Sequence, residues 1–374
     1  MRRDPATAEK DRSGLGGSGR FAAVTAVFFV LLVIAAAAGT VLGSVDIGAG
    51  KVLSLLRGGL DLWLRSLFSR DPSAAAELDA FVRAGGESQI LFHIRLPRVL
   101  LAAVLGGSLS VSGYLLQVFF RNPIAGPFVL GISSGARMAV GMTLIFLGGR
   151  IGALSSMSLV AAAFAGSLLI TCLVLLFSQR ARSMSMLLVV GIMAGYICGA
   201  VTDFCISFAA DQEIAGLTAW SMGSFSGADW DDVRIALGVC LPGLFAALLM
   251  IKPVSVYALG EGYARSMGVR TGAVRVLLIL VSSLLSACVT ALAGPVSFVG
   301  IAVPHISRSL LRSSKPSRVI TASFIFGAFF CVACDLIART AFAPSELAIG
   351  SVTALFGAPV VIRMMMGRRR EEDA

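Results

Sequence analysis

Charged residues are scarce in this chain, and histidine is scarcer still. Only 14% of its 374 residues are Asp, Glu, Lys or Arg, against about 25% in soluble domains. Two histidines and 21 carboxylates leave little material for a metal site or for acid–base catalysis. The composition therefore disfavours an enzyme, and we expect no catalytic residue, no metal ligand and no cofactor bound by this chain.

A phosphate-binding loop of the form G-x-x-x-x-G-K-[ST] is also missing. Gly50-Lys51 comes nearest, but Val45 and Val52 occupy the positions that need Gly and Ser or Thr. If this protein depends on ATP and Mg²⁺, partner subunits must bind them and ATP hydrolysis must take place on a separate polypeptide.

The formal net charge of +10 is compatible with nucleic-acid binding. The basic residues, however, lie in short clusters between apolar runs, and they are not interleaved with the aromatic side chains that single-strand binders use. They fit topology signals that face anionic lipid. We expect no nucleic-acid partner.

Cysteine could indicate redox or metal chemistry, because Cys331 and Cys334 have C-x-x-C spacing. No second pair accompanies them, and every cysteine falls inside an apolar run. We interpret all seven as small packing residues: Cys172, Cys198, Cys205, Cys240, Cys288, Cys331 and Cys334.

Long apolar runs are what the chain does have, since 57% of its residues are hydrophobic. A run of about 20 apolar residues crosses a bilayer as a helix, because only a helix satisfies its own backbone there. The sequence thus predicts an all-α, polytopic membrane protein with about ten transmembrane helices. The eighth is short, contains Pro304, and could be re-entrant. The expected spans are 21–43, 98–119, 127–147, 153–177, 186–209, 232–251, 273–293, 297–311, 319–340 and 347–366.

The distribution of Lys and Arg predicts the orientation. We expect residues 1–20 to form a disordered basic tail, residues 21–366 to form a single transmembrane domain, and residues 367–374 to form a second cytoplasmic tail. The first apolar run is longer than the apolar core of a signal peptide, so we expect a retained helix. Most basic residues then share the side of both termini, which the positive-inside rule assigns to the cytoplasm: Arg2, Arg3, Lys10, Arg12, Arg20, Arg121, Arg180, Arg182, Lys252, Arg265, Arg270, Arg275, Arg308, Arg312, Lys315, Arg318, Arg363 and Arg368–Arg370.

Two loops are long. In the extracytoplasmic loop, 44–92, Asp71 and Pro72 predict the start of a helix that Gly85–Gly86 ends, with Leu78, Phe81 and Val82 on one face.

In the cytoplasmic loop, 253–272, Leu259, Tyr263 and Met267 recur every four residues and predict one apolar face on a short helix. That face fits either the membrane surface or the groove of a partner protein.

Specific motifs carry a family resemblance, in order from about residue 93 to 363. The chain resembles the FecCD-type permeases, the membrane subunits of type II ABC importers for iron–siderophore complexes, haem and vitamin B12. The motifs are His93–Arg98, Gly106–Gly113, Phe120–Pro127, Leu130–Ala136, Trp220–Gly227, Ala258–Glu261, Ala293–Gly300, Val303–Ile306, Asp335–Arg339 and Ser345–Gly350.

The resemblance implies the partners and the location. It implies a multi-pass protein of the bacterial cytoplasmic membrane, a second permease subunit (the same or a related chain), two ABC ATPase subunits and an extracytoplasmic substrate-binding protein. The inner loop matches the family's coupling helices, so the resemblance favours ATPase docking through Leu259, Gly260, Glu261, Tyr263, Arg265 and Met267.

Six charged residues stand out. Arg95, Arg98 and Arg339 resemble the family's docking arginines for the binding protein, although such side chains can also anchor at headgroups. Asp335, four residues before Arg339, can pair with it. Arg137 and Asp203 lie within predicted spans, where a charged side chain either lines a water-filled pathway or needs an ion-pair partner. A third interpretation is that these residues lie nearer the membrane interface than the predicted spans suggest. His305, beside Pro304, we interpret as structural.

Three functions stay open. The first is an ATP-driven importer subunit working by alternating access, with an iron chelate (siderophore or haem) as substrate and cobalamin or another corrinoid as the alternative. The second is a secondary transporter driven by an ion gradient. The third, a membrane-embedded enzyme, is disfavoured by the shortage of candidate acids, bases and nucleophiles.

Overall fold

The structure is a computed structural model that describes residues 17–43, 45, 47–68, 77, 80–83, 85–151, 155–178, 180 and 184–372. Every regular element in these ranges is a helix. The expected all-α class is confirmed. Asp71, Pro72 and Leu78, on which the helix predicted in the outer loop depended, lie outside the described residues.

All ten predicted spans correspond to helices. Eight of them are long and apolar enough to cross a membrane, and α7 has a shorter apolar stretch, Ile132–Leu147. The helix α15 has 13 residues, so it rises about 20 Å and cannot cross about 30 Å of hydrocarbon by itself. The ten are α2 (Gly17–Val41), α6 (Leu96–Phe120), α7 (Ile132–Ile151), α8 (Ser156–Ser178), α9 (Met184–Ile206), α11 (Trp230–Leu249), α14 (Thr271–Ala293), α15 (Val299–Leu311), α16 (Pro316–Thr340) and α17 (Ile349–Glu372).

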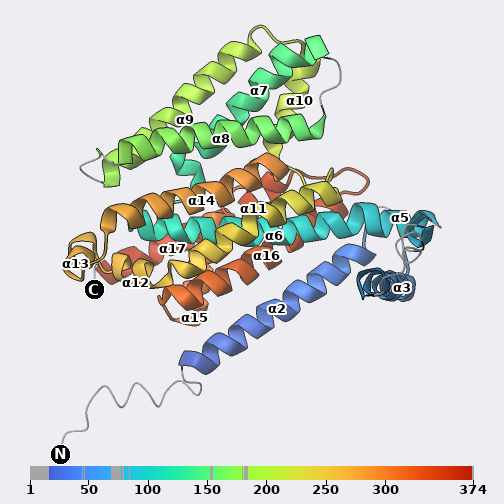
Figure 1. The fold of residues 1–374 in the computed structure, drawn as a ribbon, viewed down its shortest axis with the longest axis horizontal. Coiled ribbons are helices and arrows are strands. Elements are labelled where there is room, and N and C mark those ends of the chain that lie inside the picture. The colour runs from blue at the N-terminus through green and yellow to red at the C-terminus, as the bar shows by residue number, and fades with distance from the viewer. Residues whose placement is uncertain are drawn as a thin grey trace, which may run out of the picture.

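The helix α6 forms the centre of the bundle and packs against α16, α14, α15 and α11. Glycines permit these close crossings. A Cβ on Gly113 would lie 1.8 Å from the carbonyl oxygen of Gly300, and one on Gly106 would lie 2.5 Å from that of Gly327. Small residues let membrane helices approach in this way. Helices α7, α8 and α9 form a second layer above this bundle in Figure 1, joined to it mainly through α14.

Shorter helices occupy the two ends of the bundle. Figure 1 shows α12 and α13 at the end where α2 begins and α17 finishes, and α3 and α5 at the opposite end. We call these the α12–α13 end and the α3–α5 end. The short elements are α3 (Ala49–Phe68), α5 (Gly86–Gln89), the π-helix η1 (Ile90–Arg95), the 3₁₀ turn η2 (Pro127–Leu130), α10 (Asp211–Met222), α12 (Ile251–Ala258) and α13 (Glu261–Ser266).

Several element boundaries differ from the sequence prediction. The helix α2 begins at Gly17, inside the tail that was predicted to be disordered as far as Arg20, and α17 continues past residue 366 to Glu372. The inner loop holds two helices, because Gly260 breaks the predicted one with a φ of 136° and ψ of 141°. Such positive φ values favour glycine, which has no Cβ to clash.

Candidate functional sites

The first candidate site is the exposed surface of the α12–α13 corner. Leu259, Tyr263 and Met267 expose 71%, 53% and 61% of their surface, although the break at Gly260 means that they do not share one continuous helix. The opposite side of the corner is buried, with Tyr257 and Ala264 fully covered. An apolar surface is thus presented outward by a corner that is itself anchored in the bundle.

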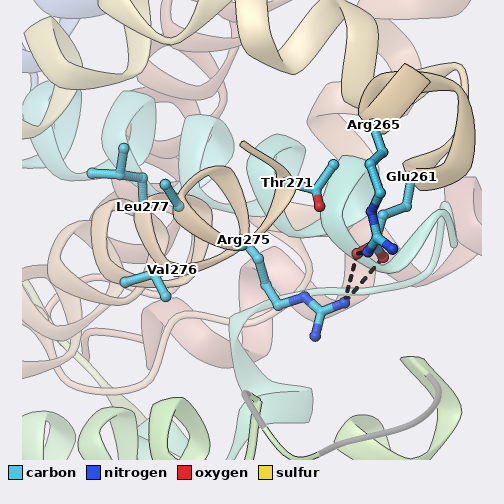
Figure 2. Close-up of a pocket in the computed structure, with 8 residues that line it drawn as sticks. Glu261, Arg265, Thr271, Arg275, Val276 and Leu277 are labelled. Atoms are coloured by element: carbon cyan, nitrogen blue, oxygen red, sulfur yellow. Dashed lines mark hydrogen bonds and ion pairs between the residues drawn. The ribbon is translucent and has the colours of Figure 1, made fainter. Parts of the chain in front are cut away.

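An ion pair ties this corner to α14, and the same arginine of α14 is hydrogen-bonded to the end of α8. Glu261 accepts two hydrogen bonds from the Arg275 guanidinium of α14, both 3.0 Å long, as Figure 2 shows. The other terminal nitrogen of Arg275 donates to the carbonyl oxygen of Ser178, at the end of α8, over 2.8 Å. Arg265 lies 3.6 Å from Glu261. Both bonds come from one guanidinium nitrogen of Arg275, so a single side chain of α14 links the carboxylate on α13 to the end of α8.

A cavity of about 620 Å³ lies between α13 and the first turns of α14. Its lining includes Glu261, Arg265, Thr271, Arg275 and Leu277.

Tyr257 lies on the buried side of the α12–α13 corner. The Arg121 guanidinium lies 5.9 Å from the centre of the Tyr257 ring, within the range of a cation–π contact. Burial raises the pKa of the Tyr257 hydroxyl, and the Glu261 carboxylate raises it further. The ring therefore stays neutral at physiological pH.

The second candidate site is a cluster of three arginines at the α3–α5 end. Arg95, Arg98 and Arg339 come from η1, α6 and α16, and they line one cavity of about 260 Å³ together with Glu346. The structure brings together residues that are far apart in the sequence, as the resemblance implies. All three arginines are buried, with exposures of only 3%, 5% and 7%.

The last turn of α2 accepts hydrogen bonds from two of these arginines. Arg95 donates to the carbonyl oxygens of Thr40 (2.8 Å) and Val41 (2.7 Å), and also to that of Val45. Arg339 donates to the Gly39 carbonyl oxygen over 2.5 Å. The final carbonyls of a helix have no partner within it, so these guanidinium groups cap α2.

Small residues in the last turn of α2 and just after it make this capping possible. A Cβ on Gly39 would lie 2.9 Å from a terminal nitrogen of Arg339, and one on Gly43 would lie 2.8 Å from a terminal nitrogen of Arg95. Larger side chains at these positions would push the guanidinium groups away from the carbonyls.

Arg98 is enclosed by two carboxylates. Asp335 accepts hydrogen bonds of 2.9–3.1 Å from one edge of the guanidinium, and Glu346 accepts bonds of 2.9 and 3.1 Å from another. The Asp335 carboxylate also lies 3.8 Å from the Arg339 guanidinium, so the predicted i,i+4 ion pair forms. Arg98 is nevertheless the closer partner of Asp335. Asp335 is 2% exposed, whereas the Glu346 side chain is 41% exposed. In the sequence, Glu346 stands out only as part of the Ser345–Gly350 motif.

Arg137 and Asp203 are both exposed on the isolated chain. Gly131 contacts Gly191, and Gly141 contacts Thr202, so α7 and α9 run parallel in a fixed register. In that register Asp203 lies five residues beyond the level of Arg137, an axial offset of about 7 Å. Across the described parts of the two helices no ion pair joins these side chains. The structural-pair interpretation therefore has no support.

The cysteines and His305 lie within the helices. Six cysteines are buried and Cys172 is exposed; all seven are free thiols. A sulfur–sulfur contact of 3.8 Å joins Cys240 and Cys288 on α11 and α14. In the ranges that the structure covers, no group of three or more His, Cys, Asp or Glu residues could hold a metal ion.

The fold defines a multi-pass membrane protein, and comparison with known proteins identifies it as a transport component. The family model described as the FecCD transport family matches residues 22–367. The chain belongs to that family, and the resemblance seen in the sequence motifs is confirmed.

Two curated relatives illustrate the match. The chain is 37% identical to the vitamin B12 import system permease protein BtuC of Klebsiella pneumoniae, over 75% of this chain and 83% of that protein. It is 34% identical to the hemin transport system permease protein HmuU of Yersinia pestis, over 76% of this chain and 85% of that protein.

A solved structure described as an inward-facing ABC transporter of metal-chelate type has the same fold. It superposes with a TM-score of 0.75 at 24% identity, covering 92% of this chain and 99% of that one.

Proposed function

We propose that the chain is the membrane-spanning subunit of an ATP-driven importer that takes up an iron chelate, a siderophore or haem, by alternating access. In this arrangement it lies in the bacterial cytoplasmic membrane with the α12–α13 end in the cytoplasm. The arginines near that end, including Arg265, Arg270, Arg275 and Arg312, support this orientation through the positive-inside rule.

The observation that carries the proposal is the exposed apolar surface of Leu259, Tyr263 and Met267 on a corner clamped to α14 and α8. A surface of this kind suits a groove on an ATPase subunit. Two such subunits bind ATP and Mg²⁺, and the clamp of Glu261 and Arg275 passes their movement to the membrane helices. This chain contributes a difference in stability between inward-open and outward-open states.

The α3–α5 end receives the binding protein. Arg95, Arg98 and Arg339 line the cavity that faces this partner, and a partner carboxylate can enter it by replacing the exposed Glu346 on Arg98. A second permease subunit completes the pathway, and Arg137 and Asp203 are candidates to line it because both are exposed on the single chain.

Haem is supported as substrate by the resemblance to HmuU. Cobalamin is the second candidate, and the observation that favours it is the 37% identity with BtuC.

Uptake into proteoliposomes tests the proposal. The permease is reconstituted with its ATPase and binding protein, and radiolabelled ferric siderophore, haemin and cyanocobalamin are supplied in turn. ATP-dependent accumulation of an iron chelate is expected. Uptake of cyanocobalamin alone would select the second candidate, and uptake driven by a proton gradient without ATP would contradict both.

A further inference from the structure

The helix α3 lies at the α3–α5 end and runs across the bundle. Figure 1 shows it nearly along its axis, whereas the spanning helices run across the picture. It contacts α2 beside the outer end of that helix. Because the spanning helices define the membrane normal, α3 lies roughly parallel to the membrane surface at the ends of the spans.

One side of α3 packs onto the protein. Val52 is 3% exposed and belongs to a small cluster with Ile47 and Leu91, against which Leu55 and Leu56 also pack. A Cβ on Gly59 would lie 2.5 Å from the Phe92 ring, so the helix sits directly against that ring. These packed positions recur every three or four residues and form one face.

The remaining surface of α3 divides into two stripes. An apolar stripe holds Leu53 and Leu60, which are 52% and 56% exposed, seven residues apart and so on one side of the helix. A polar stripe holds Ser54, Arg57 and Asp61, all exposed, with Lys51 at its edge. Going round the helix, the apolar stripe lies between the packed face and the polar stripe.

We propose that α3 is an interfacial helix whose Leu53 and Leu60 stripe is inserted into the lipid leaflet at the α3–α5 end. A helix parallel to the surface presents one side to lipid and another to water, and its two stripes match these two sides. Arg57, which borders the apolar stripe, can extend to phosphate headgroups while the leucines lie below it.

The residues next to α3 favour lipid as the molecule that covers its apolar stripe. The neighbouring α2 exposes Ile34 (57%) on its surface, and Leu42 (46%) follows directly after its last residue, so the transmembrane helix beside α3 presents apolar side chains to lipid. A binding protein would meet the polar stripe instead.

Membrane insertion of α3 has a consequence for the arginine cluster. The segment that links α2 to α3 contains Val45, whose carbonyl oxygen accepts a hydrogen bond from Arg95. Anchoring α3 in the leaflet fixes both ends of this segment, and with it the position of Arg95. The inference does not depend on which substrate is transported.

Photo-crosslinking tests the inference directly. Benzoylphenylalanine is placed at Leu53, at Leu60 or, as the matched control from the polar stripe, at Ser54 of the full-length protein. The protein is reconstituted in liposomes of phosphatidylethanolamine and phosphatidylglycerol, and adducts are measured by mass spectrometry. Lipid adducts several-fold more abundant at positions 53 and 60 than at 54 are expected.

Equal lipid labelling at all three positions would overturn the inference. The same variants are also illuminated in native membranes. A protein adduct at position 53 in place of lipid would overturn it too, and would assign the stripe to a docking partner. Because all three positions are exposed, the variants are expected to keep the wild-type melting temperature, and a variant that does not is replaced by its neighbour on the same stripe, Ala49 or Arg57.

Discussion

Glu346 and Arg98 are joined by two hydrogen bonds, of 2.9 and 3.1 Å, although they lie 248 residues apart in the chain. The arginine is buried and the glutamate is half exposed. Asp335, which holds another edge of the same guanidinium, is buried as well. Of the two carboxylates on Arg98, Glu346 is therefore the one that a partner can displace.

Replacing Glu346 by Gln should strengthen docking of the binding protein. The change removes the internal competitor for Arg98 while Asp335 still balances its charge, and we expect affinity to rise by about tenfold, or about 1.4 kcal/mol. Surface plasmon resonance on nanodisc-embedded permease measures it at several salt concentrations.

The control is Glu87→Gln, which removes an exposed carboxylate from the same end of the molecule without touching Arg98. If both variants gain affinity equally, general electrostatics accounts for the effect and Glu346 is not a competitor.

Asp335→Asn should destabilise the protein severely. The substitution leaves the buried guanidinium groups of Arg98 and Arg339 short of negative charge, and stranding a buried ion typically costs about 3–5 kcal/mol. We expect a lower melting temperature in detergent and less permease in the membrane. Asp231→Asn, which breaks an exposed pair with Arg234, should change stability by about 1 kcal/mol or less. Similar losses from both would contradict the buried network.

The double substitution Leu259→Asp and Tyr263→Asp should uncouple transport from ATP hydrolysis. Both side chains are exposed, so insertion and folding should survive while the apolar contact with the ATPase is lost. Substrate uptake is expected to fall at least about tenfold, as burying two large apolar side chains contributes about 3 kcal/mol or more. Phe342→Asp, which changes an equally exposed residue at the opposite end, should leave ATPase coupling intact. Wild-type uptake by the double variant would refute the docking role.

Gly260→Ala should impair coupling, whereas Gly262→Ala should not. Gly260 has a φ of 136°, which strains any residue with a Cβ, whereas Gly262 lies in α13 with open space around it. Strain of this kind costs of the order of 1–3 kcal/mol and would tilt α13 away from its clamp with Arg275. The ratio of ATP hydrolysed to substrate transported measures the effect. Equal ratios for the two variants would show that the corner tolerates another backbone path.

The charges of Arg137 and Asp203 should act independently. No ion pair joins these two residues across the described parts of α7 and α9, so Arg137→Glu and Asp203→Arg should have additive effects on expression and uptake. A double-mutant cycle on the two reversals measures the coupling energy. Rescue of either single reversal by the other would show that the residues meet in some state of the transporter.

The sequence by itself determined the class of protein, the spans and the family. Apolar runs of about 20 residues can satisfy their backbone in lipid only as helices, so ten of the helices follow from composition and length. The ordered motifs from His93 to Gly350 likewise fixed the family without any coordinates. The apolar spacing of Leu259, Tyr263 and Met267 marked a surface that is indeed exposed.

Tertiary structure alone decided how the charges are used. The sequence marked Arg95, Arg98 and Arg339 as a docking set, but it could not reveal that Arg95 and Arg339 cap the last turn of α2, or that Asp335 and Glu346 enclose Arg98. A long side chain on one helix can reach many hydrogen-bond acceptors on others. Which acceptor it contacts depends on where the backbones approach closely, as they do at Gly39 and Gly43. Periodicity reports the faces of one helix, whereas these contacts depend on how several helices pack together.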